Sequence, residues 1–334
     1  MSIERDETLR IQKTSVRGES EVWILNGYFY KKMTDNELDA YVHLERHSIT
    51  LEDEANISVP QFLGPATVEE LRLLKQTYEG IGRLVSEDQY KISTLRSIDY
   101  KDIEERFGLG LNYTSEDFDN IFESLRNMRR IVSNVELEFP EDYESSAPDL
   151  IQRSKKTIDG YLGISDGYPL PIIEKTQSFL KGIDKPIAHR DLNWSNIGVV
   201  KSPDGSKWNL EIADWGSFGF AYSGYDEGRL FTRLSLNLEL QEVYLNRLNL
   251  YVGESFNEIT AKKFLISFWR TAVIRSHREI ALTLLGRYAN PVNFKYDVFT
   301  KSENKKCDFY HSFIESHKSI IKQGVDNLEI LLSN

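Results

Sequence analysis

Near the N-terminus, apolar and polar residues are arranged as expected for a small antiparallel sheet. Glu21–Leu25 reads as a strand, and Tyr28–Met33 reads as its return strand. Between them stands Asn26-Gly27, a preferred two-residue hairpin turn. Apolar residues then recur at helical spacing over 36–47, which predicts a helix. The pattern therefore predicts a strand-rich N-terminal part that contains at least one helix.

Beyond residue 86, helical periodicity dominates the chain. Ser115 is followed by two acidic residues, a typical helix N-terminus. A separate segment, Val199–Ile212, reads as strand, Pro-Asp-Gly turn and strand. The predicted helices are Ser115–Val135, Pro171–Gly182, Leu238–Leu250, Ile259–Leu285 and Asp308–Leu331.

Composition limits the classes of protein that fit. The chain has 334 residues, which is enough for two lobes, and one cysteine, which excludes an internal disulfide framework. A net charge of −11 argues against a general nucleic-acid binder. The N-terminus is too charged for a signal peptide, and no apolar run is long enough to span a membrane. A cytoplasmic protein without nucleic-acid or membrane partners is expected.

Candidate chemistry lies in two neighbouring motifs. His189-Arg190-Asp191 is followed by Asn196, five residues after Asp191, and Asp214-Trp215-Gly216 follows the predicted hairpin. In phosphoryl transfer, one carboxylate lies beside the acceptor hydroxyl, while an amide oxygen and a second carboxylate bind Mg²⁺. Each motif alone is weak, and a loop with unrelated polar residues is the alternative. The order and spacing of all the parts favour the functional interpretation.

These motifs resemble the protein-kinase-like fold, and more closely its branch of aminoglycoside and choline-kinase-like phosphotransferases. Asn193 stands where protein kinases usually have Lys, and no Ala-Pro-Glu follows Asp214. The branch often has Asp-Trp followed by a further Asp, and Asp226 lies twelve residues after Asp214. Arg190 departs from the branch, which usually has Gly there, so the class of acceptor stays open.

The resemblance implies an α+β, two-lobed protein-kinase-like fold. A small N-terminal antiparallel-sheet lobe would cover 1–80, and a larger, mostly helical C-terminal lobe would cover 81–334, with the boundary near Gly80 to Gly82. The family has a phosphate-contacting lysine on the strand that corresponds to Tyr28–Met33. Strand alternation does not decide between Lys31 and Lys32, and the family pattern of three apolar residues before Lys favours Lys31.

The resemblance also implies a nucleotide site around that lysine. A helix glutamate usually pairs with it, and Glu45 on the apolar face of the 36–47 helix is the candidate, a solvated Glu being the alternative. Val16–Ser20 is a weak candidate for a phosphate loop. Leu71–Gly80 would run into the inter-lobe hinge, with Gln76 and Tyr78 as cofactor-binding candidates. The implied cofactors are ATP, with GTP as an alternative, and Mg²⁺.

The implied activity is transfer of the γ-phosphate to a hydroxyl of a small molecule. Asp191 would act as the catalytic residue, Asn196 and Asp214 as metal ligands, and Asp226 as a structural tie to the catalytic loop. The alternatives are a silent nucleotide-binding regulatory module and a protein-directed kinase. No oligomeric state follows from the sequence.

The distribution of charge bears on the acceptor. Residues 86–150 carry 16 Asp and Glu against 7 Lys and Arg. In the resembled enzymes, helices from this part of the chain help to form the acceptor site. A cationic acceptor, an amine-bearing sugar or amino-alcohol, is therefore expected, a solvated acidic face being the alternative.

Overall fold

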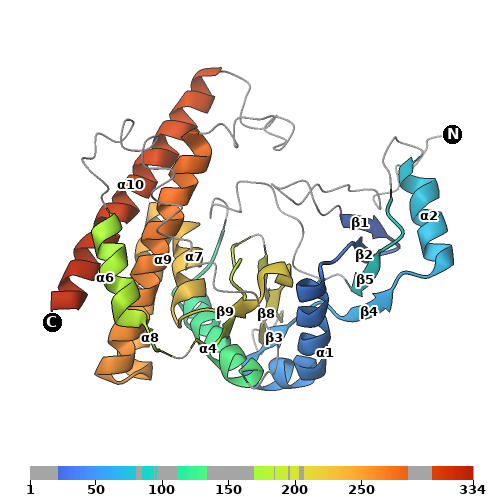
Figure 1. The fold of residues 1–334 in the computed structure, drawn as a ribbon, viewed down its shortest axis with the longest axis horizontal. Coiled ribbons are helices and arrows are strands. Elements are labelled where there is room, and N and C mark those ends of the chain that lie inside the picture. Colours follow the sequence, from blue (N-terminus) through green and yellow to red (C-terminus); the bar gives the residue numbers. More distant parts are fainter. Residues whose placement is uncertain are drawn as a thin grey trace. The chain divides into compact units, whose positions relative to one another are not determined.

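The structure is a computed structural model in which the chain divides into two compact units (Figure 1). Unit 1 comprises residues 1–100 and 196–218, and unit 2 comprises residues 101–195 and 219–334. The predicted lobe boundary near Gly80 to Gly82 and the predicted phosphate loop at Val16–Ser20 lie outside the described residues. The described residues are 22–79, 85–93, 95, 111–133, 169–183, 185–194, 196–202, 207–284 and 303–333.

Unit 1 contains the predicted N-terminal sheet. Strands β1 (Val22–Leu25) and β2 (Tyr28–Lys31) pair antiparallel, which confirms the predicted hairpin. Asn26 and Gly27 have φ angles of 52° and 76°, as a type I′ turn requires. Strands β5 (Tyr90–Ser93) and β4 (Phe62–Pro65) complete the sheet in the order β1-β2-β5-β4.

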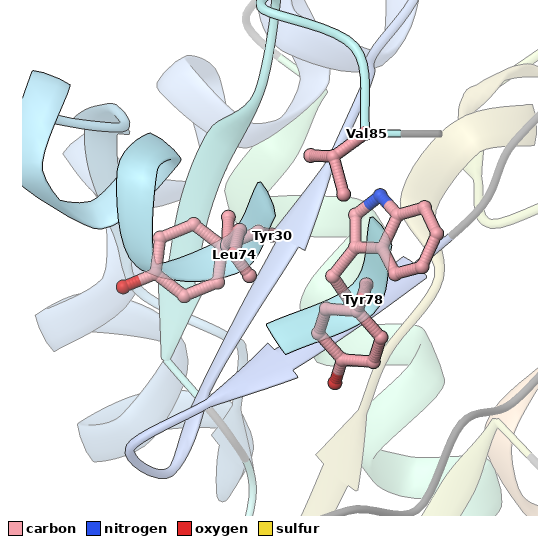
Figure 2. Packing of buried hydrophobic residues seen from close by; sticks show 5 residues of the cluster. Tyr30, Leu74, Tyr78 and Val85 are labelled. Atoms are coloured by element: carbon pink, nitrogen blue, oxygen red, sulfur yellow. The ribbon is translucent and has the colours of Figure 1, made fainter. Parts of the chain in front are cut away.

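Two helices of unit 1 pack through residues of β2 that face opposite sides of the sheet. Helix α2 (Val68–Tyr78) begins with a capping box formed by Thr67 and Glu70. Tyr30 packs into a core cluster with α2, shown in Figure 2. The next residue of β2, Lys31, contacts helix α1 (Asp35–Ala55). The cluster consists of Trp23, Tyr30, Leu74, Tyr78 and Val85.

The hinge interpretation of Leu71–Gly80 is wrong for the residues that the structure describes. Residues 68–78 are helical, so the main-chain groups of this segment are used within the helix rather than in an extended connection. Gln76 is exposed on α2, and Tyr78 is fully buried with its ring centroid 4.6 Å from that of Trp23. The apolar periodicity of this segment is therefore explained by the packing of α2 in the core cluster.

A second sheet in unit 1 carries the segment from Asn196 to Asp214. Strands β7 (Ile197–Lys201) and β8 (Trp208–Ile212) form the predicted hairpin, although its turn at 203–206 lies outside the described residues. Strand β3 (Ile57–Ser58) pairs parallel with β8. After β8, the Ala213 amide donates to the Asn196 carbonyl at 2.8 Å. The hairpin thus returns the chain beside Asn196, as predicted.

Unit 2 is mostly helical, and the five predicted helices are present with small differences at their ends. Helices α9 and α10 are long and lie side by side (Figure 1). An aromatic cluster that includes Phe118, Tyr244 and Phe231 forms part of the core. The elements are α4 (Ser115–Val132), α6 (Leu170–Leu180), β6 (Ile187–Ala188), β9 (Gly219–Phe220), α7 (Tyr225–Thr232), α8 (Leu238–Ser255), α9 (Glu258–Leu284) and α10 (Glu303–Ser333).

Two glycines allow α7 to lie close against the backbone of α9. A Cβ atom on Gly224 would lie 2.5 Å from the Phe264 carbonyl oxygen, and one on Gly228 would lie 2.6 Å from that of Phe268. Both distances are too short for any side chain at these positions. The two glycines therefore fix the position of α7 within unit 2.

We expect Gly228→Ala to lower the free energy of unfolding by roughly 1–3 kcal/mol, because the added methyl overpacks a contact with backbone. Gly253→Ala in α8 is the matched control, since its Cβ would meet nothing within 4 Å. That change should be neutral or stabilise the helix by up to about 1 kcal/mol. Urea unfolding midpoints of the two variants check this, and equal midpoints would contradict the packing argument.

Candidate active site

Lys31 is the centre of a buried charged cluster in unit 1. Its Nζ donates to Glu37 Oε1 at 2.7 Å and to Asp214 Oδ1 at 3.3 Å. Lys32 points away and pairs with the exposed Asp88. Since neighbouring strand residues face opposite sides, only one of the two lysines can approach Asp214, and in the structure it is Lys31.

The carboxylate beside Lys31 comes from Glu37, which corrects the predicted pairing with Glu45. Glu45 is exposed, whereas Glu37 is buried in the first turn of α1. Helix α1 begins at Asp35, shortly after β2 ends at Lys31, so its first turn adjoins the lysine. Glu45 follows eight residues later, about 12 Å farther along the helix axis.

Sequence reasoning missed Glu37, although a signal was present. Thr34 caps α1 by accepting from the Glu37 amide, and Asp35 and Glu37 are acidic residues of the first turn. An N-cap followed by acids marks a helix start directly after a strand. That signal would have placed Glu37, rather than Glu45, near the end of β2.

The electrostatics of this cluster favour a charged lysine. Burial by itself lowers the pKa of Lys31, but the carboxylates of Asp214 and Glu37 outweigh it, and the pKa of Lys31 is raised above its ordinary value. The side chain of Lys31 is only 11% exposed, while that of Asp214 is 45% exposed. The cluster thus presents one accessible carboxylate beside a buried ammonium.

Asp214 is held by the residues around it. It has a φ of 61°, in the left-handed region, where a residue other than glycine is strained. The next residue, Trp215, is fully buried and donates from its indole to the Ile212 carbonyl at 3.0 Å. Trp215 also packs edge-on against Phe218. This packing stabilises the strained conformation of Asp214.

The donor set suits a hard cation bound together with phosphate. Asp214 offers a carboxylate, and Asn196, whose backbone is tied to Ala213, offers an amide oxygen. Among the described residues, no group of three or more His, Cys, Asp or Glu side chains could hold a metal ion. Mg²⁺ usually takes one or two carboxylates, and phosphate oxygens and water complete its shell. Asn196 and Asp214 fit that pattern.

In unit 2, Asp226 organises the loop that carries Asp191. Its carboxylate accepts from the His189 amide at 3.0 Å and from the Arg190 amide at 2.9 Å, and it is fully buried. Arg190 has a φ of 65°, which explains in physical terms why glycine suits this position. The His189 ring accepts from the Asp191 amide at 3.3 Å. These contacts support the structural role predicted for Asp226.

Arg229 is a residue near Asp191 that sequence reasoning did not single out. Its Nη2 donates to Asp191 Oδ1, and its Nε donates to the Leu192 carbonyl at 3.5 Å. The side chain of Arg229 is 4% exposed, and that of Asp191 is 39% exposed. The carboxylate of Asp191, the catalytic candidate, therefore pairs with the buried Arg229 guanidinium and remains partly exposed to solvent.

Most of the described carboxylates of the acidic segment 86–150 pair with basic side chains. Glu87 pairs with Lys75 and Asp88 with Lys32, while Asp117 accepts from the Thr114 amide in the capping box of α4. Asp119 pairs with Arg247, and Glu123 pairs with Arg126. Glu116 is exposed in the first turn of α4. The remaining carboxylates of the segment lie outside the described residues.

Comparison with solved structures identifies the fold class. The chain is similar to a microcompartment-associated aminopropanol kinase, with a TM-score of 0.54, 12% sequence identity, and coverage of 96% of this chain and 92% of that chain. It is also similar to the GDP complex of wild-type aminoglycoside 2′-phosphotransferase-IIIa, with a TM-score of 0.49, 10% identity and coverage of 92% and 89%. An ethanolamine kinase of Plasmodium vivax gives a TM-score of 0.46, 12% identity and coverage of 91% and 81%.

The chain has the protein-kinase-like fold of small-molecule kinases, which confirms the predicted α+β fold class. No protein-family model matches the sequence, and no curated protein matches it. Within the described part of the chain, none of the helices has the length and apolar character needed to cross a membrane.

Proposed function

We propose that the protein is an ATP- and Mg²⁺-dependent phosphotransferase that moves the γ-phosphate to a hydroxyl of a small molecule. The observation that carries the proposal is the cluster in which Glu37 and Asp214 flank Lys31. A buried ammonium beside a half-exposed carboxylate is suited to phosphates that arrive together with a cation. The fold, which is shared with an aminopropanol kinase, supports the same reaction class.

The candidate residues of unit 1 have different proposed roles. Lys31 offsets charge on the nucleotide phosphates, and Glu37 holds its ammonium in place. Asn196 and Asp214 would bind Mg²⁺, which would neutralise the phosphate oxygens when bound. Phosphoryl transfer needs mainly positioning and charge stabilisation, and this set of residues supplies both.

Asp191 in unit 2 is the proposed catalytic residue. Its carboxylate would orient the acceptor hydroxyl and accept its proton as the oxygen bonds to the γ-phosphorus, while the bond from that phosphorus to the bridging oxygen breaks and ADP leaves. Asn196 follows five residues later, so the chain itself limits the separation of the two Cα atoms to about 18 Å. The sequence spacing thus supports the action of both residues on one substrate.

The experiment for this function measures ADP release with Mg²⁺-ATP over a panel of amino-alcohols, aminoglycosides, sugars and nucleosides. GTP is tested beside ATP. We expect at least one acceptor to raise the rate above that without acceptor, and EDTA to abolish the increase. Nucleotide binding that stabilises the protein equally with and without Mg²⁺, with no acceptor-dependent turnover, would favour a silent nucleotide-binding module instead.

A positively charged acceptor remains a prediction from the charge of residues 86–150. Screening weakens attraction between accessible charges, so the KM for such an acceptor should rise with ionic strength. Comparing a cationic acceptor with its neutral analogue at low and high salt checks this. A best acceptor that is neutral or anionic would contradict it.

The pairing of Lys31 with Glu37 can be tested by comparing two glutamates of helix α1, Glu37 and Glu45. We expect Glu37→Gln to raise the nucleotide KM roughly ten- to a hundredfold, because a charged hydrogen bond that holds the phosphate-contacting ammonium contributes about 1.5–3 kcal/mol. Glu45→Gln is the control, since Glu45 is exposed on the same helix. Steady-state kinetics compare the two variants, and a larger effect at Glu45 would restore the pairing predicted from sequence.

A further inference from the structure

We propose that Arg229 is a positioning residue for the phosphotransfer reaction: it fixes the Asp191 carboxylate in the orientation from which that carboxylate meets the acceptor hydroxyl. The inference rests on the proposed function, in which Asp191 is catalytic. It starts from the contact in which the Arg229 guanidinium donates to the carboxylate of Asp191 and to the carbonyl of Leu192.

Residues of α7 contact the segment 189–194, the proposed catalytic loop, at several points. Asp226, Arg229 and Leu230 stand at i, i+3 and i+4, so their side chains share a helix face. Asp226 accepts from two loop amides, and the Leu230 carbonyl accepts from the Trp194 indole at 3.1 Å. These contacts fix the ends of the segment 189–194. Arg229 lies between them in sequence and reaches the carboxylate in the middle.

Helix α7 is a rigid base for this arginine. Glu227 forms a bidentate ion pair with Arg129, with both N–O distances at 2.8 Å, and its carbonyl accepts from the Tyr244 hydroxyl at 2.8 Å. All three residues are buried. Together with the close approach of Gly224 and Gly228 to α9, these contacts leave α7 little freedom to move.

The chemistry of the side chain explains why an arginine is suited to this position. A guanidinium presents donors in a planar fork, so Nη2 can reach the carboxylate while Nε reaches the Leu192 carbonyl. A lysine at the same place could supply a positive charge to Asp191, but it lacks the planar fork of donors that reaches the Asp191 carboxylate and the Leu192 carbonyl together. Because Arg229 is buried, its pairing with Asp191 also satisfies a charge that burial would otherwise destabilise.

The chain offers a closely matched control. Arg233 follows one helical turn after Arg229, is likewise buried, and pairs with Glu279 at 3.0 Å, a carboxylate outside the catalytic loop. Arg229→Gln and Arg233→Gln each remove one buried guanidinium from the same region. A purely structural role for Arg229 predicts similar consequences for the two changes.

The test compares wild type, Arg229→Gln, Arg229→Lys and Arg233→Gln by steady-state kinetics, thermal unfolding and hydrogen exchange of residues 187–194. We expect Arg229→Gln to lower kcat about a hundredfold, the effect of a small misplacement of a reacting group, with little change in the nucleotide KM. Arg229→Lys should recover part of kcat. Arg233→Gln should lower the unfolding temperature by a similar amount while keeping kcat near the wild-type value.

The outcomes separate this inference from the proposed function. Equal kcat losses in Arg229→Gln and Arg233→Gln, or no loss in Arg229→Gln, would overturn the positioning role. If the wild type transfers no phosphate, the proposed function fails, and hydrogen exchange still tests the orientation of the loop. Faster exchange over 187–194 in Arg229→Gln than in Arg233→Gln supports the structural part of the inference, and equal exchange overturns it.

Discussion

Asp214→Asn is expected to lower kcat for phosphate transfer by roughly 10²–10³-fold. Asp214 presents the accessible carboxylate of the Lys31 cluster and is a proposed ligand of Mg²⁺. The amide keeps the size of the side chain but removes its charge. Lys31 would keep Glu37 as its buried partner, so the fold should survive the change.

A titration of activity against Mg²⁺ concentration measures this effect. The variant should need more Mg²⁺ for half-maximal activity than the wild type. Asp88→Asn is the control, because Asp88 is also a carboxylate 3.3 Å from a lysine but is exposed. Its Mg²⁺ titration should overlay that of the wild type. A variant at Asp214 that responds to Mg²⁺ as the wild type does would remove Asp214 from the metal site.

Asp191→Asn is expected to lower kcat by about 10²–10⁴-fold, with a small effect on the nucleotide KM. The asparagine can still accept a hydrogen bond from Arg229, but it cannot take the proton of the acceptor hydroxyl. Asp119→Asn is the control, since Asp119 also pairs with an arginine, Arg247, and is similarly exposed. Activity with the best acceptor, measured beside thermal unfolding, distinguishes loss of chemistry from loss of fold.

Much of the architecture could be predicted because it depends on local patterns. The Asn26-Gly27 turn, the β7–β8 hairpin and the helices of unit 2 follow from turn chemistry and apolar periodicity. The spacing of Asp191, Asn196, Asp214 and Asp226 was sufficient to indicate the fold class. Turn residues, apolar periodicity and motif spacing can all be recognised in a single sequence.

The errors concern contacts between elements. Glu45 satisfies the helical period, but the partner of Lys31 is decided by which turn of α1 adjoins β2, and that turn carries Glu37. Tyr78 belongs to an amphipathic helix whose apolar face packs on the sheet, and a single sequence does not distinguish that helix from a connection to a hinge. Arg229 gave no signal, because a lone arginine on a helix usually lies on the surface.

Transfer of the γ-phosphate of ATP from nucleotide to a hydroxyl is measured directly by ³¹P NMR of the protein with Mg²⁺-ATP and the acceptor panel. We expect ADP resonances to grow together with a new phosphomonoester resonance in wild type, and Asp191→Asn to show neither on the same time scale. ADP that grows only with inorganic phosphate in the presence of every acceptor, or an ATP spectrum that never changes, would contradict the proposed function.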